Sequence, residues 1–106
     1  MNIENSAVNL INTEDFVTFV NSNSIDLQII PGMNDDVLNG LTNRFNITTN
    51  IQLYGQFLLL FENSLIFTLQ TFYLWLENNF PNIENRSKIL IAFCVKEKLH
   101  MMLGIN

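Results

Sequence analysis

The stretch from residue 51 to residue 61 is apolar on nearly every side, and it limits the possible folds more than any other part of the chain. It contains no charged side chain, and its polar members are Gln52 and Gln56. A helix of this composition is buried in a core, packed against a second chain or inserted in a membrane. A single small domain cannot cover all of its faces, so we expect a two-fold dimer to bury the excess.

Gly55 lies inside this expected helix, where glycine costs about 1 kcal/mol relative to alanine. Its presence suggests that another helix approaches closely at that point. A membrane span needs about 20 apolar residues, but Glu62, Asn63 and Ser64 interrupt the run. No basic cluster flanks it to set an orientation. We therefore expect no membrane span.

Pro31 and Gly32 break the chain shortly before this helix. Gly32 can take a positive φ, and Asn34 can cap a helix that starts at Asp35. Apolar side chains recur at helical spacing from there to Phe45, and residues 25–30 would form a short first limb. Such a helix-hairpin-helix aims several free backbone N–H groups at one point, where a phosphate can bind.

The remaining pattern is also helical. We expect residues 1–12 to be a flexible N-terminal arm and residues 13–106 to form one helical domain, because 106 residues can bury a core without cross-links. Helices are expected from the cap at Asn12 or Thr13, over 65–77, and from Ile83 or Ser87 to Leu103. We see no strand pattern. The sequence therefore predicts a small, all-α, single-domain helical bundle that contains a helix-hairpin-helix element.

The charges and reactive groups favour binding over catalysis. The formal net charge is −5, but four of the five basic residues fall in the last quarter of the chain, and distribution matters more than the sum. His100 is the only histidine, and Cys94, the only cysteine, lies in an apolar stretch with no base placed to activate it. No metal-ligand spacing is visible. We expect no catalytic residue, no metal site and no cofactor, so the protein is not expected to be an enzyme.

The order of these motifs resembles barrier-to-autointegration factor, a family of small chromatin proteins that bind duplex DNA without sequence preference. The family has a Gly-Ile-Gly hairpin, then a Leu-Gly-Gln-Phe-Leu-Val-Leu helix, then a Trp-Leu pair. The resemblance covers roughly residues 14–103, and its most specific part is the Gly-Gln-Phe block. The matching segments are Asp15-Phe16-Val17, Gly32-Met33-Asn34, Tyr54-Gly55-Gln56-Phe57-Leu58-Leu59-Leu60, Trp75-Leu76, Cys94-Val95-Lys96-Glu97 and Met101-Met102-Leu103.

The resemblance implies a homodimer that bridges double-stranded DNA, resident in the nucleus and cytoplasm. DNA contacts would come from the hairpin backbone and from nearby basic side chains: Gly32, Met33, Asn34, Arg44, Arg86 and Lys88. The dimer surface, which in the family also takes LEM-domain proteins of the inner nuclear membrane, would comprise Leu53, Tyr54, Gly55, Phe57 and Leu59.

The chain also departs from the family pattern at the hairpin. Asn34 replaces the second glycine, Asp35 and Asp36 both occupy the first helical turn, and the family's lysine pair is replaced within residues 39–42. These changes favour an alternative, a diverged relative that lost DNA binding. It would act as a protein–protein interaction module, pairing with a conventional family member or with LEM-domain proteins. An unrelated small helical interaction domain is a third possibility.

Overall fold

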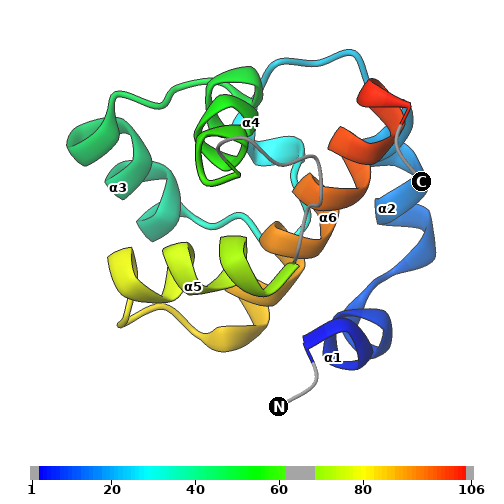
Figure 1. The fold of residues 1–106 in the computed structure, drawn as a ribbon, viewed down its shortest axis with the longest axis horizontal. Helices are drawn as coiled ribbons and strands as arrows, with labels where there is room; N and C mark the ends of the chain where they lie inside the picture. The colour runs from blue at the N-terminus through cyan, green and yellow to red at the C-terminus, as the bar shows by residue number, and fades with distance from the viewer. Residues whose placement is uncertain (1–2, 62–68, 105–106) are drawn as a thin grey trace.

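In the computed structural model, which describes residues 3–61 and 69–104, the protein is all-helical (Figure 1). No strand occurs in that part of the chain, where an isolated antiparallel bridge joins Asp26 and Thr49. None of the helices found there is long and apolar enough to span a lipid bilayer. The elements in chain order are α1 (Ile3–Leu10), α2 (Thr13–Asn21), a 3₁₀ turn η1 (Leu27–Ile29), α3 (Asp35–Phe45), α4 (Asn50–Leu59), α5 (Leu69–Asn79) and α6 (Asn85–Leu103).

The helices begin where the sequence places caps. Asn12 caps α2 by accepting from the Asp15 N–H at 3.1 Å. Thr49 forms a capping box with Gln52 at the start of α4, and this satisfies donors that would otherwise lack partners. At the other end of the chain, Gly104 ends α6 in the left-handed conformation, with φ 68°. These local signals confirm the predicted starts of α2 and α4 and the predicted end of α6.

Helix α6 is the centre of the fold. Ten of its nineteen residues are buried, and α5, α1 and α2 all pack against it. Lys98 ties α2 to α6, since its ammonium group donates to the carbonyls of Val20 at 2.6 Å and Ser22 at 3.2 Å. These are carbonyls that the end of α2 leaves unpaired. The long C-terminal helix therefore organises segments from both ends of the chain.

The structure corrects the expectation of a flexible N-terminal arm. Residues 3–10 form α1, which packs against α6 and α5. Ala7 is fully buried, and Leu10 and Ile11 pack partly against the core. The helix has only eight residues, so it depends on tertiary contacts, as most protein helices do.

Two other expectations concern the limits of elements. The first limb of the hairpin is the single 3₁₀ turn η1, so a full helix-hairpin-helix is not seen. Helix α5 extends to Asn79, two residues beyond the expected end, and stops before Pro81. The predicted break at Glu62-Asn63-Ser64 and the predicted helix start at Leu65 lie outside the described residues.

Candidate nucleic-acid interface

The chain reverses direction at a tight turn from Ile30 to Met33. The Met33 N–H donates to the Ile30 carbonyl at 3.1 Å, and Gly32 has φ +92°. Proline in the second position and glycine with positive φ in the third define a type II turn. The sequence therefore predicted the chemistry of this turn correctly.

The turn is pressed against the beginning of α6. A Cβ added to Gly32 would lie 2.7 Å from the Leu90 Cβ and 2.7 Å from the Ser87 carbonyl oxygen. The Asn34 amide also donates to the Ser87 hydroxyl at 3.3 Å. Close approach of the two backbones and this hydrogen bond hold the hairpin beside the first turn of α6. The sequence does not reveal this docking, because the two segments are more than fifty residues apart.

Three helix N-termini line one hollow of about 370 Å³ at this corner. The capping residues of α2, α3 and α6, which are Asn12, Asn34 and Glu84, all contribute to its wall. Each N-terminus carries a partial positive charge from its unpaired N–H groups. The hollow therefore combines three weak sources of positive potential, which is the physical basis of anion binding at helix starts.

The start of α3 presents free backbone donors. The Asn34 side chain accepts from the Val37 N–H at 3.0 Å. The backbone N–H groups of Asn34, Asp35 and Asp36 have no acceptor among the described residues. The side chains of both aspartates are exposed in this first turn. They satisfy the helix dipole themselves and would repel an approaching anion.

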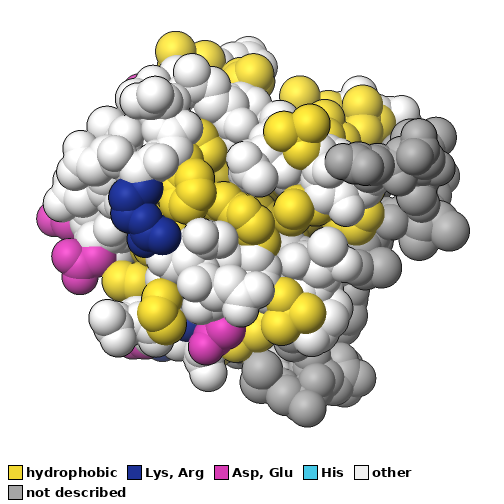
Figure 2. All heavy atoms as spheres, turned by 60° about the vertical axis from the view of Figure 1, so that its left-hand side comes forward, with side chains coloured by type: hydrophobic (Ala, Val, Ile, Leu, Met, Phe, Trp, Pro, Cys, Tyr) yellow, Lys and Arg dark blue, Asp and Glu magenta, His cyan; other side chains and the backbone are white. Residues whose placement is uncertain are grey.

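The predicted basic residues are not gathered here. Arg86 is exposed and lines the hollow with Gly32, Met33 and Asn34, so four of the six expected DNA-binding residues lie together. Arg44 does not join them, because its guanidinium donates to the Asn79 carbonyl at 2.6 Å and stacks over the Phe80 ring. There it caps the C-terminus of α5. Figure 2 shows the side of the molecule on which α3 lies. Basic side-chain atoms there lie against a band of apolar side chains.

The assignment of Lys88 to a DNA-binding surface is corrected by its burial. This side chain is 1% exposed, and its ammonium group lies 2.6 Å from the Glu77 carboxylate and 3.2 Å from the Phe80 carbonyl. A buried charge needs such partners. Lys88 therefore joins α6 to the end of α5 and the loop that follows it, and it has no access to a ligand.

Acidic side chains outnumber the basic side chain, Arg86, that lines the hollow. Asp15 and Glu84 line it together with Arg86. The Ser87 hydroxyl donates to Glu84 at 3.2 Å. The formal side-chain charge of the lining is thus negative, and attraction for an anion would have to come from the backbone N–H groups and Arg86.

The expected dimer surface on α4 divides into a buried and an exposed half. Leu53, Tyr54 and Phe57 are 0%, 3% and 0% exposed, so they belong to the core of the single chain. Their assignment to a dimer surface is corrected on this ground. Burial raises the pKa of the Tyr54 phenol to about 12, with a smaller contribution from nearby Cys94.

The exposed half of α4 retains the character expected of an interface. Gly55 and Leu59 face outward, and the sequence analysis missed Ile51 and Leu58, which are 54% and 39% exposed. Positions 51, 55, 58 and 59 follow helical spacing and form one stripe, which we call the α4 stripe. Apart from the backbone of α4 itself, no atom of the described residues lies within 4 Å of a Cβ built on Gly55, so these residues leave room there for a second helix.

The reactive groups noted in the sequence are in protected settings. Burial, with a smaller effect of Glu97, raises the pKa of the Cys94 thiol to about 12, so the group is a thiol at neutral pH and not the nucleophilic thiolate. Within the described part of the chain, no three His, Cys, Asp or Glu side chains gather in a way that could hold a metal ion.

Acid titration is expected to report on the Lys88–Glu77 pair. The hydrogen bond from Lys88 is the largest cause that lowers the pKa of Glu77 from 4.5. A lowered pKa contributes stability that is complete above the unfolded value and is lost as the pH falls through the folded value. We expect the free energy of unfolding, measured by urea titration between pH 6 and pH 3, to fall less steeply in Glu77→Gln than in the parent chain. Glu14→Gln, at an exposed position on α2, is the control. An unchanged acid dependence in Glu77→Gln would contradict this assignment.

No family model matches the chain, and neither a curated protein nor a solved structure does. The geometry defines a small helical protein with a hollow lined by three helix N-termini at the hairpin and an exposed apolar stripe on α4. Its class is therefore argued from these two features and from the sequence motifs alone.

Proposed function

We propose that this chain is a diverged member of the barrier-to-autointegration factor family. In this proposal it binds the phosphate backbone of duplex DNA at the hairpin corner, without reading base sequence. The observation that carries the proposal is the presence of the α3 cap residue Asn34 and exposed Arg86 in the lining of one hollow, to which three helix N-termini contribute. Contacts of this kind position a protein on DNA without specifying sequence.

Self-association is the second part of the proposal. The α4 stripe would pack against its copy across a two-fold axis, as isologous interfaces do, and Gly55 would allow the two helices to approach closely. A dimer would carry two hairpin corners and could bridge two DNA segments. Pairing with LEM-domain proteins and residence in the nucleus and cytoplasm remain proposals that depend on the family resemblance.

DNA binding is tested by adding the full chain to a fluorescently labelled duplex and following anisotropy at about 20 mM and 150 mM salt. We expect saturable binding that is blind to sequence and weakens with salt, with a modest slope because few cations take part. Arg86→Glu should abolish it. Arg44→Glu makes the same change in net charge away from the hollow. Once circular dichroism shows that this variant is folded, it should retain most of the affinity for DNA. Absence of binding by the parent chain at low salt, or an equal loss in both variants, would exclude the DNA proposal.

Dimerisation is tested by Gly55→Glu. A Cβ added at Gly55 meets no described atom outside the backbone of α4, and glutamate is a better helix former than glycine by up to about 1 kcal/mol. The expected result is therefore a monomer in sedimentation equilibrium whose melting temperature equals or exceeds that of the parent monomer. Gln56→Glu places the same charge on α4 outside the stripe and should leave the dimer intact. A parent chain that is monomeric at high micromolar concentration would refute this part of the proposal.

A second candidate function is a protein–protein interaction module without DNA binding. It is favoured by the acidic groups Asp15, Asp35, Asp36 and Glu84 around the hairpin and by the engagement of Arg44, Lys88 and Lys98 in structural contacts. The two candidates separate cleanly. A chain that dimerises through the α4 stripe and fails to bind DNA at low salt supports the module.

A further inference from the structure

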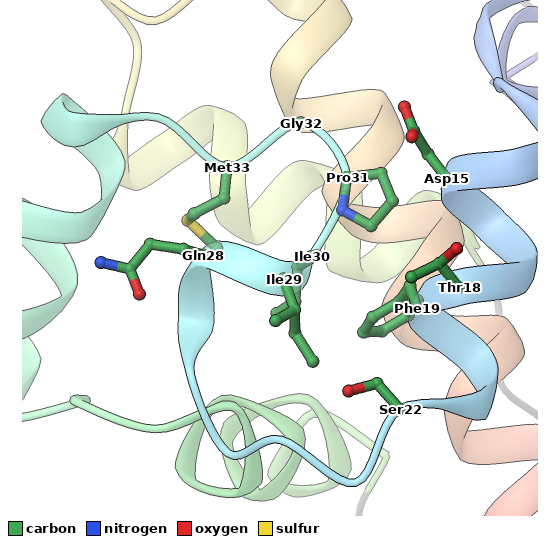
Figure 3. Close-up of a pocket in the computed structure, with 10 residues that line it drawn as sticks. All are labelled: Asp15, Thr18, Phe19, Ser22, Gln28, Ile29, Ile30, Pro31, Gly32 and Met33. Atoms are coloured by element: carbon green, nitrogen blue, oxygen red, sulfur yellow. The ribbon is translucent and has the colours of Figure 1, made fainter.

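A second hollow, of about 350 Å³, lies between α2 and the limb that leads into the hairpin. Its volume falls in the range of sites that hold ligands. Figure 3 shows Phe19 projecting from α2 toward the limb and the Pro31 ring projecting from the limb toward α2. The residues that line it are Asp15, Thr18, Phe19 and Ser22 from α2 and its C-cap, Gln28, Ile29 and Ile30 from the limb, and Pro31, Gly32 and Met33 from the turn.

The base of this hollow is apolar, and its rim is polar. Phe19 and Ile30 are each 1% exposed and belong to the core, while Ile29 and Met33 are half-buried in the wall. Thr18 and Gln28 are exposed at the rim. A branched or aromatic side chain of a partner could replace water over this base, and a polar backbone could remain at the rim.

The limb offers unpaired backbone groups along the hollow. The N–H of Gly32 and the carbonyls of Ile29 and Pro31 form no hydrogen bond with other described residues. The backbone of a bound peptide could form hydrogen bonds with these groups, and side-chain pockets would supply specificity. From Asp15 to Ser22 the helix axis rises about 10 Å, which is the length of about three extended residues.

The charged side chain that lines this hollow, Asp15, is acidic. Asp15 is exposed beside Pro31 (Figure 3) and forms no ion pair with any described residue. Among the described residues, no lysine or arginine lines this hollow. Asp15 also lines the hairpin hollow, where it and Glu84 outnumber the single cation Arg86. A basic group on an occupant would therefore meet a carboxylate next to an apolar base, and complementary charge of this kind chiefly determines which partner is accepted.

We propose that this hollow binds a short extended peptide segment of a partner protein, carrying an apolar side chain followed within one or two residues by lysine or arginine. The apolar side chain lies over Phe19 and Ile30, the basic side chain pairs with Asp15, and the segment's backbone bonds to the limb. This inference goes beyond the proposed function, because neither DNA phosphate nor the α4 stripe uses the apolar base at Phe19 and Ile30, although Asp15, Pro31, Gly32 and Met33 line both hollows.

The test is selection of a random heptapeptide phage library on the immobilised full-length chain. Sequencing of the recovered phage should give a consensus of an apolar residue followed by a basic one. Selection on Asp15→Lys should replace the basic position by aspartate or glutamate, a reversal that a purely structural role of Asp15 would not produce. Glu14→Lys makes the same charge change on the neighbouring exposed residue, outside the hollow, and should preserve the original consensus.

A synthetic peptide of the recovered consensus then gives a dissociation constant by isothermal titration calorimetry. Thr18→Arg, which fills the rim, should weaken binding at least tenfold, and Asp15→Asn should weaken it by a similar factor. Recovery of no consensus, or a consensus unchanged in Asp15→Lys, would overturn the proposal. So would binding that persists in Thr18→Arg. The DNA-binding proposal is tested separately by Arg86→Glu, so either proposal can fail without the other.

Discussion

Gly32→Ala is expected to lower the free energy of unfolding by at least about 2 kcal/mol, since left-handed geometry costs about 1–2 kcal/mol and overpacking adds about 1–3 kcal/mol. Gly32 has φ +92°, and an added Cβ would lie 2.7 Å from both the Leu90 Cβ and the Ser87 carbonyl oxygen. Neither neighbour can move easily, because both belong to the buried beginning of α6. Urea unfolding followed by circular dichroism measures the loss.

Gly104 provides the matched control for this prediction. It also has a positive φ, 68°, but apart from its chain neighbours no atom of the described residues lies within 4 Å of a Cβ built there. Gly104→Ala therefore isolates the backbone term, and the difference between the two variants measures the clash with α6. Equal losses in both variants would show that the hairpin is not held against α6 in the way the structure describes.

Phe57→Ala is expected to cost about 3–5 kcal/mol, the usual loss for a fully buried phenylalanine. The Phe57 side chain is 0% exposed and meets the Phe72 ring edge-on, with centroids 4.5 Å apart. This substitution should therefore destabilise the monomer and not merely separate two subunits. Thermal unfolding at low protein concentration, where any dimer has dissociated, measures the effect.

Leu59→Ala, two positions along α4, is the comparison for Phe57→Ala. Leu59 is 68% exposed, and exposed substitutions usually change stability by less than about 0.5 kcal/mol. Its expected effect is confined to self-association, measured by sedimentation equilibrium. If both variants lose the same amount of monomer stability, the division of α4 into a buried and an exposed face is wrong.

Most of the secondary structure could be predicted because its signals are local. Helix α3 runs over the predicted residues from Asp35 to Phe45, and Asn34 caps it as expected. The Pro31-Gly32 pair predicted the turn, and Thr49 predicted the start of α4. Each of these features depends on residues within four positions of one another, so the sequence pattern contains the necessary information.

The composition of the candidate site was harder to predict, because it depends on which side chains the fold buries. Lysine side chains are usually exposed, and nothing near Lys88 in the sequence shows that Glu77 and the Phe80 carbonyl will surround it. The apolar run of α4 gave no sign of which half would face the core. Gly40 illustrates the same limit, because the Phe80 ring lies against it and would clash with an added Cβ.

The sequence by itself determined that this protein is all-helical, where its chain turns and which residues begin and end most of its helices. Tertiary structure alone decided that α1 packs onto α6, that Lys88 and half of α4 are internal, and that Arg86 stands beside the hairpin while Arg44 does not. The physical reason is the distance along the chain over which each kind of interaction acts. Caps, turns and helical periodicity act over a few residues, whereas burial and charge pairing depend on segments that meet only after the chain has folded.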